Sequence, residues 1–176
     1  RTNTVPGQGS STPEIMFVGE GPGEEEDKQG LAFIGRAGQL LTKMIIAMGF
    51  TRDQVFIGNI VKCHPPGTET TNRAPSPEEM AACIPYLKAQ IKILRPKVIV
   101  ALGAVAVRGL LNTETGIMRL RGTWQTFEGI PVMPTYHPSY LLRNSTGKAD
   151  VWKDLQAVLA RLGRKPPPQN VQPKVT

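Results

Sequence analysis

Five carboxylates and six glycines follow a short apolar run in residues 15–38, IMFVGEGPGEEEDKQGLAFIGRAG. The run at 15–18 is partly β-branched and ends in glycine, which is typical of a buried parallel strand. Glycine at alternate positions lets the backbone turn tightly and approach a ligand closely. We therefore expect a ligand-binding turn built on the glycines Gly19, Gly21 and Gly23.

A glycine-rich turn after a strand first suggests a dinucleotide site, in which a helix N-terminus binds a pyrophosphate. The acidic residues oppose that interpretation, because carboxylates repel the phosphate that a helix N-terminus attracts. They suit a substrate that becomes positive in its transition state. Glu24, Glu25, Glu26 and Asp27 fit better as a solvated first helical turn, whereas Glu20, between two glycines, fits that alternative least.

Two further polar side chains follow predicted strands. Asn59 interrupts the apolar run 55–61 near its end, where an unpaired amide would cost roughly 1–3 kcal/mol. It either bonds neighbouring backbone or offers one acceptor and two donors to a base edge. His137 follows the run 130–133, so we expect a loop position. It is either a surface histidine or a neutral donor to a leaving group, a role worth roughly 3–4 kcal/mol.

Several side chains suit contact with nucleic acid. Phe33 is either part of the core or a face on which a base stacks, which is worth roughly 1–3 kcal/mol. Ser139 and Arg143 can bind phosphate. Leu141 and Leu142 would be unusual exposed leucines unless they act as a wedge between bases.

The chain contains two cysteines, Cys63 and Cys83. A structural disulfide is unusual in a cytosolic protein, so two free buried thiols are the simplest interpretation. Zinc and iron–sulfur sites normally need four ligands, so two thiolates alone give weak support for a metal. His64, beside Cys63, receives no predicted role.

The elements that must position these residues can be read from apolar runs and cap signals. Strands are predicted at 15–18, 55–61 and 98–102, and a hairpin or fourth strand at 124–127 and 130–133. Helices are predicted at 38–48, 76–94, 103–111 and 150–162.

This alternation predicts a parallel α/β sheet with helices on both faces. Glu20, Asn59 and His137 would each lie at the carboxyl end of a strand. Open α/β sheets bind ligands at that edge, so we expect these three side chains to converge.

Composition bounds the class of protein. The chain has 176 residues and 40% apolar composition, which suits one soluble globular domain, residues 1–163, with a Pro-rich disordered tail at 164–176. No apolar run approaches a membrane span and no signal sequence is visible, so we expect a cytoplasmic protein that does not enter a membrane. Because the chain starts at Arg1 without a methionine, we also expect residues upstream of it.

The net charge of +7 is unevenly distributed. Residues 1–27 carry one arginine against six acids, and residues 28–176 carry 20 lysines and arginines against eight acids. An acidic pocket in a basic body fits a polyanionic partner such as nucleic acid, although many ordinary proteins are as basic.

Four motifs together resemble the family 4 uracil-DNA glycosylases, the iron–sulfur type. They are GEGPGEEED, LAFIGRAGQLL, NIVKCHPPG followed by Asn72-Arg73, and HPSYLLR. The resemblance implies a single domain with a four-stranded parallel sheet flanked by helices. It also implies a monomeric, monofunctional enzyme that hydrolyses the N-glycosidic bond of uracil in DNA and leaves an abasic site for base excision repair. The alternative is a non-catalytic nucleic-acid-binding protein of the same fold.

The resemblance also implies roles in the uracil pocket. Phe33 would stack on the flipped-out uracil, and Asn59 would read its N3–H and O4. His137 would donate to O2 as the uracil anion leaves, while the backbone at Gly21 would complete the pocket. Glu20 would serve the water and the positive sugar, with Glu26 as an alternative for the water.

Further implied roles concern DNA and a cofactor. Ser139 and Arg143 would hold phosphates, and Leu141 would fill the gap left by the extruded nucleotide. Cys63 and Cys83 would be two of the four ligands of a 4Fe–4S cluster, with the other two in a CxxC motif upstream.

Overall fold

Four parallel strands form the centre of the sheet in the computed structural model, which describes residues 1–65 and 73–168. They are β2 (Ile15–Gly19), β3 (Phe56–Asn59), β4 (Val98–Leu102) and β6 (Ile130–Thr135). These strands are largely apolar, because a parallel strand with helices over both faces has no side in water. The predicted parallel α/β sheet is confirmed.

Two short antiparallel strands extend this centre, so the sheet is mixed and has six strands instead of the expected four. The order is β1-β3-β2-β4-β6-β5, with β1 (Gln8–Gly9) on one edge and β5 (Gln125–Phe127) on the other. The hairpin between β5 and β6 turns at Glu128 and Gly129, whose φ angles of 47° and 82° are those that a tight hairpin requires. Both alternatives for this region are therefore correct, because β5 and β6 form a hairpin and β6 is also the fourth parallel strand; β1 is too short to leave a periodic signal.

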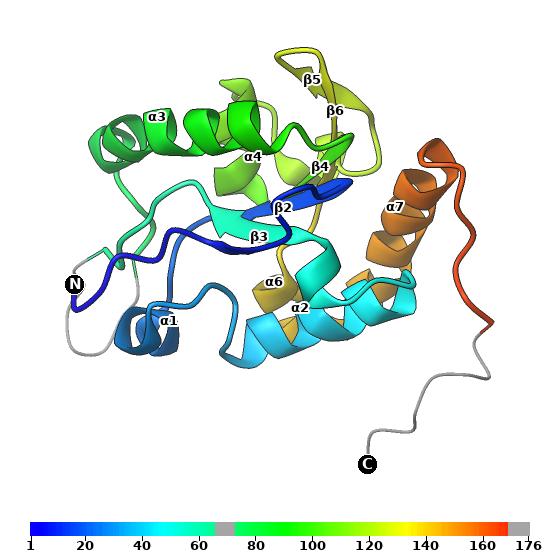
Figure 1. Cartoon of the computed structure of the whole chain (residues 1–176), viewed down its shortest axis with the longest axis horizontal. Coiled ribbons are helices and arrows are strands. Elements are labelled where there is room, and N and C mark those ends of the chain that lie inside the picture. Colours follow the sequence, from blue (N-terminus) through cyan, green and yellow to red (C-terminus); the bar gives the residue numbers. More distant parts are fainter. Residues whose placement is uncertain (66–72, 169–176) are drawn as a thin grey trace.

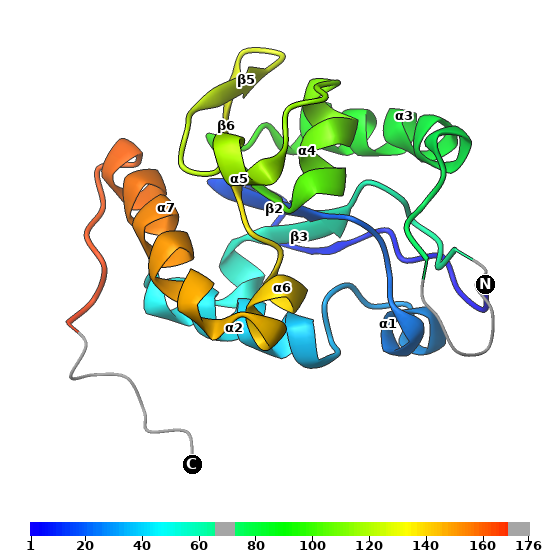
Figure 2. The same ribbon diagram turned by 180° about the vertical axis from the view of Figure 1, so that it is seen from behind.

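Helices cover both faces of the sheet (Figures 1 and 2). The α3 helix (Pro77–Leu94) and α4 (Ala104–Leu111) lie over one face. The opposite face carries α2 (Arg36–Ala47), α6 (Pro138–Arg143) and α7 (Lys148–Arg161).

The central strand β2 shows how the two cores arise. All five of its residues are buried, and successive side chains point to opposite faces. Met16 packs in the core that includes Leu87 of α3, and Phe17 packs in the core that includes Leu41 of α2. Because side chains on both faces of β2 pack against helices, the residues free to contact a ligand are those at the end of the strand.

The helix-capping residues predicted the start of α3 to within one residue of its observed position. Ser76 accepts a hydrogen bond of 3.2 Å from the backbone N–H of Glu79, and Pro77 occupies the first helical position. Three shorter helical elements are α5 (Ile117–Leu120), η1 (Arg52–Gln54) and η2 (Ser145–Gly147).

The run of four acids forms most of α1 (Glu24–Gln29). Glu24 and Glu25 are exposed and pair with Lys28 at 3.0 and 3.5 Å, so the solvated-turn interpretation is confirmed for these two. It is wrong for Asp27, which is buried and accepts hydrogen bonds from two backbone N–H groups near the start of the chain. Those hydrogen bonds keep the pKa of Asp27 below its usual value although burial raises it.

The predicted tail begins with an anchored residue. Arg164 donates to Glu14 at 2.7 and 3.3 Å and lies over the ring of Phe50. Residues 169–176 lie outside the described part of the chain, so their predicted disorder stays a prediction. Within 1–65 and 73–168, every helix is too short or too polar to span a bilayer.

Candidate active site

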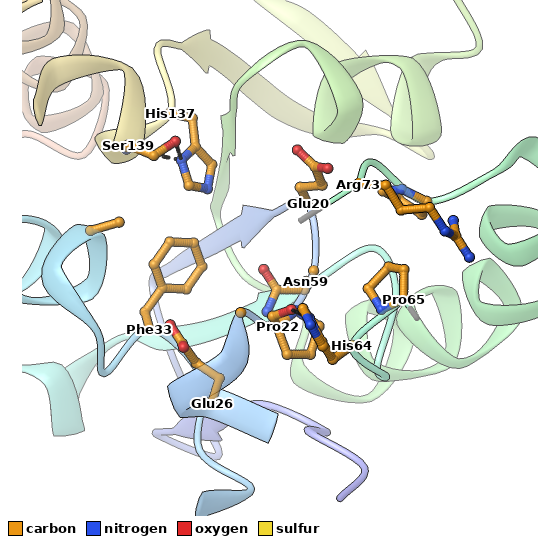
Figure 3. A pocket seen from close by; sticks show the side chains of 14 residues that line it. Glu20, Pro22, Glu26, Phe33, Asn59, His64, Pro65, Arg73, His137 and Ser139 are labelled. Atoms are coloured by element: carbon orange, nitrogen blue, oxygen red, sulfur yellow. Dashed lines mark hydrogen bonds between the residues drawn. The ribbon is translucent and has the colours of Figure 1, made fainter. Parts of the chain in front are cut away.

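A cavity of about 280 Å³ opens at the carboxyl ends of the parallel strands. Glu20 follows β2, Asn59 ends β3 and His137 follows β6, and all three side chains line this cavity, as predicted. In Figure 3 the side chains of Asn59 and His137 face one space, which Phe33 borders from the side, and Glu20 lies at its edge with its carboxylate directed away from Asn59. The rest of the lining comes from Gly21, Pro22, Gly23, Glu26, Ala37, His64, Pro65, Arg73, Pro75 and Ser139.

Asn59 is 1% exposed and presents a carbonyl oxygen, Oδ1, that has no hydrogen-bond partner among residues 1–65 and 73–168. A buried polar atom without a partner costs roughly 1–3 kcal/mol, so this oxygen marks a place where a ligand donor can bind. The strand end itself is firmly held. The buried Lys62 ammonium donates to the Asn59 backbone carbonyl at 2.7 Å, and burial lowers the pKa of Lys62 to about 8.

His137 is partly buried at the N-cap of α6, so the expected loop position is close to the observed one. Its Nδ1 accepts from the Ser139 backbone N–H at 3.0 Å and lies 2.7 Å from the Ser139 hydroxyl, which donates to it. Burial lowers the pKa of His137 to about 4, so the ring is neutral near pH 7. Because Nδ1 is an acceptor, the ring proton resides on Nε2, which makes the imidazole a neutral hydrogen-bond donor.

The backbone around His137 is fixed by a buried polar cluster. Asp154 of α7 accepts from the Thr135 hydroxyl at 2.7 Å and from Arg121 at 2.6 and 3.1 Å. Thr135 ends β6 two residues before His137. The charge-assisted bonds of this cluster therefore set the direction in which the chain leaves the sheet.

Phe33 is both buried and part of the cavity lining, so the two interpretations of this residue are compatible. Its ring centroid lies 5.6 Å from that of His137, and its φ of 52° is in the left-handed region, which costs roughly 1–2 kcal/mol for a non-glycine residue. Two glycines make room for it. A Cβ at Gly19 would lie 2.4 Å from the Phe33 ring, and a Cβ at Gly38 would lie 1.9 Å from the Phe33 carbonyl oxygen.

Two carboxylates line the cavity, Glu20 and Glu26. Burial raises the pKa of Glu20, which makes its carboxylate a stronger base than a solvated one. Glu26 accepts a hydrogen bond of 3.4 Å from the backbone N–H of Gly35, at the start of α2. The residue pattern grouped Glu26 with solvated residues, whereas the family resemblance gave it as an alternative for the water, and its place in the cavity depends on how α1 packs.

The glycine turn is bound to the loop that follows β3. Backbone N–H groups of that loop donate to the carbonyls of Gly19 and Glu20 at 2.9 and 3.1 Å. His64 adds a third bond, because its Nδ1 lies 2.8 Å from the Pro22 carbonyl and must donate to it. His64 therefore lines the cavity and supports the turn, a role that sequence reasoning missed because Pro22 is 42 residues away in the chain.

The residues proposed to contact DNA divide into two groups. Ser139 lines the cavity and Arg143 is exposed on α6, and their contact with phosphate stays a prediction. The expectation that Leu141 is exposed is wrong: it is 2% exposed and belongs to the core beneath α2 and α7, whereas Leu142 is 42% exposed. Successive residues of a short amphipathic helix face different sides, which the run of two leucines did not reveal.

Cys63 and Cys83 are free and partly buried, and both line a second cavity of about 520 Å³ between the loop after β3 and α3. Arg1 donates to the Cys63 sulfur at 3.0 Å, and Lys62 lines the same cavity. Within the described residues, no group of three or more His, Cys, Asp or Glu side chains is placed to hold a metal. Asn72, part of one motif, lies outside the described residues.

Comparisons with known proteins agree with this geometry. The model of the Uracil DNA glycosylase superfamily matches residues 6–156. The type-4 uracil-DNA glycosylase of Thermotoga maritima is 51% identical over 152 residues, which cover 84% of this chain and 76% of that protein. That of Sulfurisphaera tokodaii is 46% identical over 167 residues, which cover 90% and 74%. A type-5 uracil-DNA glycosylase of Pyrobaculum aerophilum is 33% identical over 174 residues, which cover 89% and 74%.

These matches confirm the resemblance drawn from the motifs, and they extend over nearly all of the described domain. The chain belongs to the uracil DNA glycosylase superfamily.

Proposed function

We propose that this chain is a monofunctional uracil-DNA glycosylase, which hydrolyses the bond between uracil and deoxyribose in DNA. One observation carries the proposal: the buried, unpartnered Oδ1 of Asn59 borders a cavity that Phe33 and a neutral His137 also line. The names of the type-4 relatives support the same substrate. The cavity of about 280 Å³ is at the small end for ligand sites, which favours a single base over a dinucleotide.

Recognition of uracil follows from the amide of Asn59. Uracil presents a donor, N3–H, beside an acceptor, O4, so Oδ1 accepts from the first while Nδ2 donates to the second. Cytosine presents the reverse order, and a wrong base leaves buried polar groups unpaired. Because the cavity lies inside the protein surface, the base must be extruded from the helix, which costs a few kcal/mol.

Cleavage leaves negative charge on uracil and positive charge on the sugar, and the site offers one group to stabilise each charge. As the bond between C1′ and N1 breaks, the electron pair moves into uracil and the Nε2–H of His137 donates to the negative O2. The Glu20 carboxylate stabilises the positive sugar and takes a proton from the attacking water. The water oxygen bonds to C1′, and the proton ends on uracil, so the products are free uracil and an abasic site. We assign Glu20 to the water and Glu26 to positioning, because Glu26 already bonds the start of α2.

On the DNA side, we propose that Ser139 and Arg143 contact phosphates flanking the uracil. Ser139 also orients His137, so its substitution would affect the base as well as the backbone. Leu142, and not the buried Leu141, is the exposed leucine that can enter the gap left by the nucleotide.

The two cysteines fit part of an iron–sulfur site. Cys63 and Cys83 line one cavity, and the cations Arg1 and Lys62 line it with them. We propose that they supply two of the four ligands of a 4Fe–4S cluster, which when bound would link the loop after β3 to α3. In protein that carries all four ligands, iron and acid-labile sulfide should be present at about four of each per molecule, and Cys83→Ala should lower both. Protein that contains neither would refute this assignment.

The function is tested by incubation with an oligonucleotide that holds one uracil, followed by alkali, which cuts the strand at an abasic site. We expect strand scission with uracil and none with thymine or cytosine at that position. Binding of the oligonucleotide without release of uracil would instead support a non-catalytic nucleic-acid-binding protein. We further propose a monomer that acts in the cytoplasm.

A further inference from the structure

The segment that carries Phe33, residues 30–35, connects α1 to α2 without regular helical or sheet structure of its own. Such a segment is held in place by side chains from elsewhere, because few of its backbone groups bond each other. Gln8 of β1 accepts from the backbone N–H of Ala32 at 3.1 Å. Glu26 accepts from the backbone N–H of Gly35 at 3.4 Å, and the carbonyls of Ala32 and Phe33 accept from a single arginine in η1.

That residue is Arg52. Its Nη2 donates to the Ala32 carbonyl at 2.7 Å, and its Nη1 donates to the Phe33 carbonyl at 2.9 Å. Nη1 also donates to the Thr42 hydroxyl of α2 at 2.9 Å. A guanidinium is planar and its donors keep fixed directions, so one side chain locks two successive carbonyls and fastens them to α2.

These two carbonyls lie on either side of the residue with the positive φ angle. The carbonyls of Ala32 and Phe33 flank the Phe33 Cα, whose φ is 52°. The direction of the ring depends on that backbone conformation, which is rare for a bulky residue and needs support from its surroundings. The ring fits closely against Gly19, because a Cβ added at Gly19 would lie only 2.4 Å from the Phe33 Cζ.

Arg52 acts on the cavity from outside, since it is not among the described residues that line it. Resting on the proposed function, we infer that Arg52 is a positioning residue that holds the Phe33 ring where an extruded uracil stacks. It contributes no donor to the uracil, so its effect on the reaction passes through Phe33.

A double-mutant cycle tests this directly. The variants are Arg52→Met, which keeps the aliphatic stem and removes the donors, Phe33→Ala, and the two combined. Single-turnover release of uracil is measured with a single-stranded oligonucleotide. We expect Arg52→Met to lower the rate about tenfold in the native background and no more than about twofold when Phe33 is already alanine. An equal loss in both backgrounds would overturn the inference.

Two further variants separate positioning from general destabilisation. Thr42→Val removes one bond of Arg52 but leaves both carbonyl bonds, so we expect a rate within about twofold of wild type. If Arg52→Met does not fold, Arg52→Gln, which keeps one amide donor, replaces it in the same cycle. A tenfold loss in Thr42→Val would show that loosening α2 suffices, and would overturn the role given to the carbonyl bonds.

Wild-type protein measured beside the variants separates a failure of the proposed function from a failure of the role given to Arg52. Inactive wild type would overturn the proposed function and this inference with it. Active wild type with an additive cycle would overturn the role of Arg52 alone.

Discussion

The protonation of His137 gives a prediction that can be worked out in numbers. Burial lowers its pKa from 6.5 to about 4, and the bonds from Ser139 to Nδ1 place the proton of the neutral ring on Nε2. A donor aimed at a developing negative charge contributes roughly 3–4 kcal/mol, so His137→Gln should reduce uracil release by about 10²- to 10³-fold.

The same pKa affects stability. In the unfolded chain His137 takes up a proton as pH falls below 6.5, whereas the folded chain resists until about pH 4. Protonation between pH 6.5 and about pH 4 therefore favours the unfolded state. The resulting loss of folding free energy is complete below about pH 4. A full shift of this size corresponds to roughly 3 kcal/mol, of which about 2 kcal/mol is reached at pH 5. Between pH 7.5 and pH 5, the His137→Gln variant should therefore lose about 2 kcal/mol less than wild type.

Nitrogen NMR of the imidazole rings tests the first point, and urea unfolding at the two pH values tests the second. The chain contains two histidines, so a His137→Gln spectrum assigns both. We expect the His137 ring to show a protonated Nε2 and a bare Nδ1 at pH 7, with a midpoint near 4. A midpoint near 6.5, or a proton on Nδ1, would refute the reasoning about the leaving group.

Four other substitutions probe separate parts of the structure. Burial raises the pKa of Glu20, so the wild-type rate should fall as the pH drops through that pKa. The Glu20→Gln variant should lack this fall at acidic pH, and its rate should be at least about tenfold lower. A pH–rate profile of both proteins measures these effects. Gly38→Ala should lower uracil release at least about tenfold, because its Cβ would lie 1.9 Å from the Phe33 carbonyl oxygen. Leu142→Ala should lose more activity on double-stranded than on single-stranded DNA, whereas Leu141→Ala should lose roughly 2–5 kcal/mol of stability, measured by urea unfolding.

Each of these predictions has a definite opposing result. A Glu20→Gln profile with the wild-type acidic limb would assign that limb to another group. Gly116→Ala is the control for Gly38→Ala, since nothing lies within 4 Å of its added Cβ, and equal losses in both would remove the steric argument. Equal losses on both DNA forms for Leu142→Ala would exclude it as a wedge.

Much of the fold could be predicted from local patterns. The continuous apolar runs identified the four parallel strands, and the Ser76 cap fixed the start of α3. Because parallel strands end at a common edge, the positions of Glu20, Asn59 and His137 after strands were enough to predict that they meet. The edge strand β1 was missed, since two residues are too few for a periodic signal.

The errors in the site have a common physical cause. The burial of Leu141, the bond from His64 to Pro22 and the bonds from Arg52 to Phe33 all depend on contacts between distant segments. Local periodicity cannot report such contacts, because it registers only neighbours along one helix or strand. The glycines in the sequence indicated a close approach of other groups, but the packing was needed to show which neighbour each glycine accommodates.

The central claim is that one cavity places the Asn59 amide and the His137 imidazole on the same uracil. Titration of the labelled protein with free uracil, followed by NMR of side-chain nitrogens, tests it most directly. We predict concerted shifts of the Asn59 amide and of His137 Nε2 with uracil, none with cytosine, and none at the exposed amide of Asn112. Uracil that shifts neither side chain, or only one of the two, would contradict the account.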